Sequence, residues 1–82
     1  MKLILLKSAQ KDLDNLPDKI ALPISNQINK LSNNPFGQNS KKLEGGKGYR
    51  IRIGDYRVVY TADKKNRVIY ITKIGHRREI YR

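Results

Sequence analysis

The segment 49–60 constrains the fold more than any other part of this sequence. Apolar residues alternate with Arg50 and Arg52 before the pair Gly54-Asp55, and with Arg57 after it. Alternation with a period of two indicates strands with one buried face, and a Gly-Asp pair is a tight-turn signal. The segment therefore predicts a β-hairpin. Because side chains alternate between the faces of a strand, a register that buries the tyrosines places Arg57 beside Arg50 and Arg52 on the other face.

The remaining elements follow from apolar spacing. A short apolar run predicts a first strand over 2–6, and helical spacing predicts two helices, one starting after Ser8 as its cap and one ending before Asn33. Pro23 lies inside the apolar stripe of the second helix and lacks an N–H, so the regular part of this helix is expected to begin near Pro23. Residues 34–48 are interpreted as a polar connection. The strands are expected over 49–53, 56–61 and 67–74.

This order, β-α-α-β-β-β, predicts a small α+β single domain over residues 1–82, an antiparallel four-stranded sheet with two N-terminal helices packed on one face. Helices covering one face leave the other open to water. The shared spacing of the apolar residues predicts one core cluster between the helices and the sheet: Leu13, Leu16, Ile20, Ile24, Ile28, Leu31, Ile51, Ile53 and Val58.

Charge is distributed unevenly along the chain. The net charge is +11; residues 1–46 contribute +3, residues 47–82 contribute +8, and every arginine lies in the second part. Arginine binds phosphate in a bidentate manner that lysine cannot reproduce. A basic half of this kind indicates nucleic acid, an anionic membrane or an acidic protein as the partner, and nucleic acid is preferred here.

Composition excludes several other classes. The chain has no cysteine, which excludes disulfides and thiolate metal sites and fits a cytoplasmic location. No apolar run approaches the roughly 20 residues that span a bilayer, so no membrane partner is expected. No metal cage or cofactor site is recognisable, and none is expected.

The C-terminal segment 75–82 adds a second set of candidate residues. It follows the last predicted strand, so it can fold over the edge of the arginine face, and it brings an imidazole, further guanidinium groups and a phenol. A lone histidine is more often structural than catalytic, and a terminal tyrosine often only packs. The position of the segment after the strand is what makes it a candidate site.

These segments together resemble the RelE/ParE toxin superfamily, and the RelE group in particular. The resemblance covers nearly the whole chain. Its motifs are Leu43-Glu44-Gly45, Tyr49-Arg50-Ile51-Arg52, Tyr56-Arg57-Val58-Val59-Tyr60 and Ile74-Gly75-His76-Arg77-Arg78-Glu79-Ile80-Tyr81. It implies a toxin of a type II toxin–antitoxin system that inhibits translation in the cytoplasm: a metal-independent endoribonuclease, or mRNA interferase, that cuts mRNA in the 30S A site of the ribosome. It also implies a cognate antitoxin as partner.

The resemblance assigns roles to eight residues. The expected catalytic residues are Arg57, Arg77, Tyr81 and His76, and the expected RNA-binding residues are Arg50, Arg52, Lys47 and Arg78. The RNA 2′-OH is expected to attack the adjacent phosphate, with Arg57 and Arg77 stabilising the added negative charge. Tyr81 is the expected base and His76 the expected acid. Arg50 and Arg52 occupy positions at which known members have lysine, and a guanidinium cannot share a proton.

Two alternatives stay open. A ParE-like toxin on the same fold would inhibit DNA gyrase without cutting RNA. A non-catalytic nucleic-acid-binding module would explain the charge without any chemistry. The terminal tyrosine and the full arginine set favour the RelE-like interpretation over both.

Overall fold

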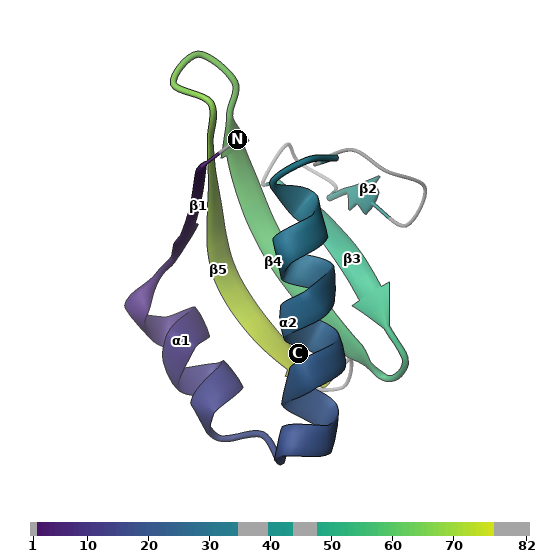
Figure 1. The fold of residues 1–82 in the computed structure, drawn as a ribbon. Coiled ribbons are helices and arrows are strands. Elements are labelled where there is room, and N and C mark those ends of the chain that lie inside the picture. Colours follow the sequence, from purple (N-terminus) through teal and green to yellow (C-terminus); the bar gives the residue numbers. More distant parts are fainter. Residues whose placement is uncertain (1, 35–39, 44–47, 77–82) are drawn as a thin grey trace.

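The computed structural model describes residues 2–34, 40–43 and 48–76. The elements are β1 (Lys2–Leu5), α1 (Lys7–Asp14), α2 (Asp18–Leu31), β2 (Ser40–Lys42), β3 (Tyr49–Ile53), β4 (Tyr56–Asp63) and β5 (Val68–His76). The strands form one sheet in the order β1-β5-β4-β3-β2, and α2 runs across one face of it (Figure 1). The predicted α+β class and the position of the helices are confirmed.

The sheet differs from the prediction in strand number and direction. Ser40–Lys42 is a fifth strand, antiparallel to β3, inside the segment interpreted as a connection. These three residues are all polar, so they show no alternation of apolar and polar side chains that would indicate a strand. The sheet is also mixed, because β1 pairs parallel with β5, starting at Lys2 opposite Val68. A parallel pair needs a long crossover, and here everything between β1 and β5 supplies it.

The helices begin differently from the prediction. The N-cap of α1 is Leu6 without a side-chain hydrogen bond, so the predicted Ser8 cap is wrong. The Ser8 hydroxyl donates instead to the carbonyl oxygen of Thr72 in β5, at 3.2 Å. Helix α2 begins directly after Pro17, and Pro23 lies inside it. The missing N–H of Pro23 removes one helical hydrogen bond, which the burial of the apolar stripe of α2 offsets.

One apolar core lies between the helices and the sheet. All nine predicted residues belong to it, either buried or packed against the buried ones. The core also contains residues that the prediction omitted: Ala9, Tyr60, Ile69, Ile71 and Ile74, with Leu3 and Leu5 packed against them. The omitted residues come mainly from β5 and from β1, which is its neighbour.

A β-bulge in β5 determines which side chains join this core. Val59 of β4 pairs with Lys73 and the next residue, Tyr60, pairs with Ile71, so Thr72 is an extra residue in β5. The Thr72 hydroxyl donates to the carbonyl oxygen of Val59 at 3.1 Å. A bulge shifts the alternation of side chains by one residue. Ile71 and Ile74 therefore both face the helices, although an unbroken strand would place them on opposite faces.

Helix α1 covers the edge of β5 that extends past the end of β1. The N–H of Leu6 donates to the carbonyl oxygen of Ile71 at 3.0 Å, next to the Ser8 contact with Thr72. One turn further on, the carboxylate of Asp12 accepts a hydrogen bond from the N–H of Ile74 at 3.2 Å. No strand among the described residues pairs with this part of the edge of β5. The contacts from α1 supply hydrogen-bond partners for the backbone groups of Ile71, Thr72 and Ile74.

Gly48, directly before β3, is fixed by its backbone. Its φ of +114° lies in a region that favours glycine, and a Cβ there would approach the carbonyl oxygen of Tyr60 to 2.5 Å. The carbonyl oxygen of Gly48 accepts from the N–H of Leu43 at 2.8 Å. Gly48 thus allows the chain to enter β3 in close contact with β4.

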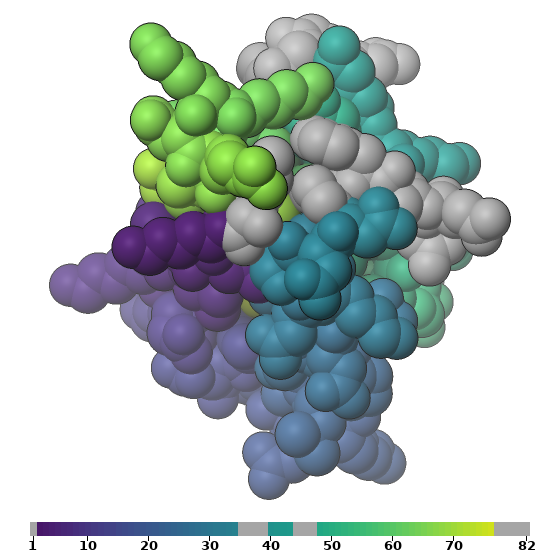
Figure 2. Space-filling model, turned by 45° about the horizontal axis from the view of Figure 1, so that its top comes forward, coloured from purple at the N-terminus to yellow at the C-terminus, as the bar shows by residue number. Residues whose placement is uncertain are grey.

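The turn between β4 and β5 (light green) projects at one end of the molecule beside β1 (dark purple) in Figure 2. The N–H of Lys2 donates to the carbonyl oxygen of Arg67 in this turn at 2.9 Å. Within the described ranges, neither helix is long and apolar enough to span a membrane.

Candidate functional site

The face of the sheet opposite the helices carries the predicted arginine cluster. Arg52 in β3 pairs directly with Arg57 in β4, and Arg50 pairs with Val59. Directly paired residues share a face, and Arg50 lies diagonal to Arg57. The strand register therefore confirms the prediction that the three arginines lie together. The face formed by Arg50, Arg52 and Arg57 is the cationic face.

The three arginines differ in exposure, which the sequence did not indicate. Arg52 is exposed and Arg50 is half-buried, but Arg57 is only 7% exposed. The prediction of three exposed guanidinium groups is wrong for Arg57. It lies in the central part of the sheet, paired with Arg52 on β3 and with Gly75 on β5. A cation with little water around it interacts with a nearby phosphate more strongly than an exposed one.

Two lysines that sequence reasoning did not select lie on the same face. Lys41 in β2 pairs with Arg50, and Lys73 in β5 pairs with Val59. Both are exposed. The short strand β2 and the bulge at Thr72 set their directions, and neither feature was predicted. The one available signal was the position of Lys73 between the apolar residues of the last strand.

His76 does not join the arginines. It pairs with Tyr56 at the end of β5, and the two rings meet edge to face with their centroids 5.5 Å apart. Both residues line a hollow against α1, together with Asp12, Asn15 and Leu16. The bulge shifts the alternation of β5, so Gly75 lies next to Arg57 and the His76 imidazole lies on the helix side. The predicted position of His76 over the arginine face is therefore wrong.

Four predicted site residues lie outside the described residues: Lys47, Arg77, Arg78 and Tyr81. Their assignments remain predictions.

Tyrosines on the helix side of the sheet link the strands that carry the cationic face. Tyr60 is fully buried, its ring stacks on that of Tyr49 at 5.7 Å, and its hydroxyl is hydrogen-bonded to the hydroxyl of Ser40 in β2. Burial raises the pKa of the Tyr60 phenol, and the hydrogen bond to Ser40 partly opposes this rise. Tyr60 therefore stays neutral at physiological pH and anchors β2, which carries Lys41.

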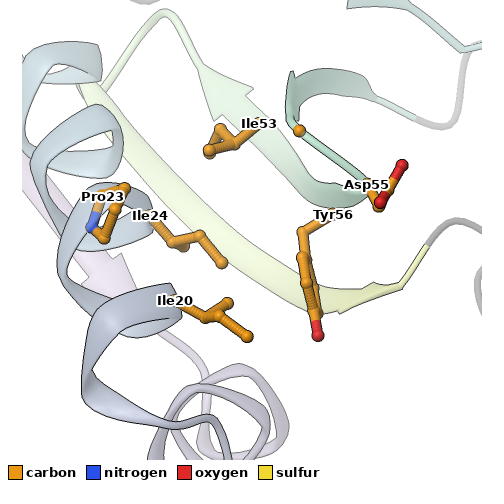
Figure 3. Close-up of a pocket in the computed structure, with 7 residues that line it drawn as sticks. Ile20, Pro23, Ile24, Ile53, Asp55 and Tyr56 are labelled. Atoms are coloured by element: carbon orange, nitrogen blue, oxygen red, sulfur yellow. The ribbon is translucent and has the colours of Figure 1, made fainter.

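A second hollow lies between α2 and the β3–β4 turn. Figure 3 shows Ile20 and Ile24 of α2 opposite Ile53 and the Tyr56 ring. Its walls are mainly apolar, and the titratable residues among the described ones that line it are Asp55 and Tyr56. The arrangement of charge needed to bind phosphate is on the other face of the sheet. Among the residues that the structure describes, no group of three His, Asp or Glu side chains is placed to hold a metal ion.

Comparison with known proteins identifies the family. The model of the family described as ParE toxin of type II toxin–antitoxin system, parDE, matches residues 3–81. A curated protein of Methanocaldococcus jannaschii, "Putative toxin RelE1", is 35% identical over 80 residues, covering 93% of this chain and 89% of that protein.

Solved structures agree with this result. The archaeal RelE–RelB complex from Pyrococcus horikoshii contains a chain that is 32% identical, with a TM-score of 0.80 and 93% coverage of both chains. The toxin–antitoxin complex RelBE2 of Mycobacterium tuberculosis contains one that is 26% identical, with a TM-score of 0.82, 93% coverage of this chain and 96% of that chain. The chain therefore belongs to the RelE/ParE superfamily, as a RelE-like toxin of the type II toxin–antitoxin class.

Proposed function

We propose that this toxin is a metal-independent endoribonuclease that cuts mRNA in the ribosomal A site. The observation that carries the proposal is the pair Arg52–Arg57, two directly opposed cations on the cationic face, with Arg57 nearly buried. Like charges directly across two strands are destabilising. An anionic partner that binds between them removes this cost, and a phosphate in an RNA chain has the required charge.

The proposed reaction uses groups of the RNA itself. A base removes the 2′-OH proton, the 2′-oxygen attacks the adjacent phosphorus, and the bond from phosphorus to the 5′-oxygen breaks. The 5′-oxygen takes up a proton from water, which leaves a 2′,3′-cyclic phosphate and a 5′-hydroxyl. Arg57 stabilises the extra negative charge on the phosphorane, and Arg50 and Arg52 hold the neighbouring phosphates. Fixed cations of this kind contribute about 10²–10³ each in rate.

The removal of the 2′-OH proton is assigned to a residue outside the arginine pair. An arginine stays protonated and cannot remove the 2′-OH proton. Tyr81 remains the proposed base, and Arg77 remains the proposed second phosphate ligand, both from the family resemblance. The ribosome adds to the rate by holding the RNA in a cleavable geometry.

We also propose a cognate antitoxin as partner. The relative from Mycobacterium tuberculosis was solved as a toxin–antitoxin complex, and the relative from Pyrococcus horikoshii as a RelE–RelB complex. An acidic segment of the antitoxin that covers the cationic face would block RNA and neutralise the toxin.

Primer extension on mRNA after brief expression tests the proposal. Wild-type protein should produce new 5′ ends within translated codons, and Arg57→Ala should produce none while keeping the wild-type circular dichroism spectrum. Arg67→Asn is the matched control, because it removes one exposed positive charge at the β4–β5 turn, where φ is +56° and asparagine is tolerated. This control should cut like wild type. A folded Arg57→Ala variant that cuts at the wild-type rate would refute the assignment of Arg57.

A ParE-like inhibitor of DNA gyrase is the second candidate, because the matching family model is described as the ParE toxin. Labelled methionine and thymidine separate the two. The proposed nuclease stops methionine incorporation first, whereas a gyrase inhibitor stops thymidine incorporation first.

A further inference from the structure

The cationic face is wider than the predicted arginine cluster. One row of paired residues crosses four neighbouring strands, in the order Lys41 of β2, Arg50 of β3, Val59 of β4 and Lys73 of β5. A second row, beside the first and two residues along β3, contains Arg52, Arg57 and Gly75. Lys41 and Lys73 thus stand at the two ends of the first row, one on each side of the arginines.

Neither row contains a carboxylate among its described members, and both end lysines are exposed. Lys41, Arg52 and Lys73 are exposed on adjoining strands, so an anion from outside can reach all three. Lys73 is diagonal to Arg57 across the β4–β5 pair, as Arg50 is across the β3–β4 pair. The lysines therefore continue the same charged surface and are not separate from it.

The dimensions of the row indicate an extended anion. Neighbouring strands lie about 4.8 Å apart, so Lys41 and Lys73 are separated by roughly 14 Å across three strand spacings. That spread suits a chain of phosphates better than one compact anion. Proteins that hold single-stranded nucleic acid commonly use a basic surface that follows the backbone in this way.

We infer that Lys41 and Lys73 bind phosphates on either side of the scissile one, so that single-stranded RNA crosses the sheet perpendicular to its strands. This inference rests on the proposed function. It adds the direction in which the RNA crosses the cationic face. It also adds Lys41 and Lys73 as positioning residues, which hold the RNA so that one phosphate lies at Arg57.

Salt dependence of binding provides the test. The probe is a fluorescent single-stranded RNA in which every 2′-OH is methylated, so that it cannot be cut, and its affinity for the full chain is measured by anisotropy from about 50 to 200 mM salt. Each phosphate contact with single-stranded nucleic acid contributes about 0.7 to the slope of log K against log salt. Lys41→Ala and Lys73→Ala should each lower the slope by about that amount, and the double variant by about twice as much.

Matched controls separate a local contact from a change in net charge. Lys11→Ala in α1 and Lys30→Ala in α2 each remove one exposed lysine on the helix side and should keep the wild-type slope. Lys41→Arg and Lys73→Arg keep the charge and should also keep the slope. Equal slopes for all single alanine variants, or no binding by the wild type at about 50 mM salt, would overturn the inference.

The same variants show whether the row of cations binds RNA or an acidic protein. They also separate failure of this inference from failure of the proposed function. If Lys41→Ala and Lys73→Ala weaken binding of a poly-glutamate peptide but leave the RNA slope unchanged, the row binds protein and the inference is wrong. If the row lowers the RNA slope as expected while the wild type cuts no mRNA on ribosomes, the RNA path stands and the nuclease proposal fails. If the wild type cuts mRNA and the slopes do not change, only the path fails.

Discussion

The two faces of the sheet consist of alternate residues of the same strands, yet they have opposite properties. In β3 and β4, Ile51 and Val58 face the helices and are buried, whereas their chain neighbours Arg52 and Arg57 form the cationic face. The helix-covered face gains free energy by removing apolar surface from water. The cationic face costs free energy through repulsion.

This contrast teaches that stability and proposed activity are separable in this chain by single substitutions. A residue on the helix side can be cut back at a cost in unfolding free energy while the arginines keep their register. An exposed cation on the other face, such as Arg52, can be removed with little loss of stability. The predictions below test this separation, beginning with the largest effect.

The largest effect is expected for Ile28→Ala. Ile28 is 3% exposed in the core stripe of α2, and removal of its buried methyl groups should lower the unfolding free energy by about 2–5 kcal/mol. Urea denaturation followed by circular dichroism measures this. Leu22→Ala in the same helix is the control, because Leu22 is 62% exposed. Equal midpoints for the two variants would show that the stripe of α2 contributes no more than its surface.

A smaller loss is expected for Asp12→Ala, at the edge where the two faces meet. The variant leaves the N–H of Ile74 without its acceptor, which should cost about 1–3 kcal/mol and increase amide exchange at Ile74. Asp14→Ala is the matched control, since Asp14 is exposed and accepts a hydrogen bond from the Gln10 side chain of the same helix. Similar exchange at Ile74 in both variants would contradict the role of Asp12 as a substitute for a strand.

A still smaller loss is expected for Tyr60→Phe. The variant loses the hydrogen bond to Ser40, worth about 0.5–1.5 kcal/mol. It should also change the alkaline limb of stability. Because burial raises the pKa of Tyr60 in the folded state, an unfolded tyrosine, with a pKa near 10, ionises first as the pH rises. Wild-type stability should therefore fall more steeply above about pH 10 than that of Tyr60→Phe. Parallel curves of unfolding free energy against pH would refute this.

No effect on catalysis is expected for His76→Gln. The imidazole contacts Tyr56 on the helix side, so its loss should leave both limbs of the pH–rate profile of mRNA cleavage in place. Loss of one limb would return the role of acid to His76. It would also show that the proposed site is not confined to the cationic face.

The sequence predicted the parts of the fold that depend on local alternation. The β3–β4 hairpin was predicted with its turn and its register, because six apolar positions and three arginines agree on one pattern. The core stripe of α2 was equally clear. Strand β2 was missed because Ser40–Lys42 contains only polar residues, and its place in the sheet depends on β3 and on Tyr60.

The candidate site was predicted only where it lies in that hairpin. Arg50, Arg52 and Arg57 were found, but the alternation of the sequence gave no indication that Arg57 is nearly buried. Lys73 and His76 were placed by the bulge at Thr72, which requires pairing with β4 and has no local signal of its own. Register between distant segments is therefore the information that the sequence pattern lacked.

The parallel pairing of β1 with β5 has a consequence for the order of folding. Lys2 pairs with Val68, so β1 cannot join the sheet until β5, more than 60 residues along the chain, is in place. Contacts between such distant segments form slowly, because closing a long loop costs entropy before the contact forms. The β3–β4 hairpin is local and can form earlier. The arginine pair should therefore form early in folding, before β1 joins β5 and closes the sheet.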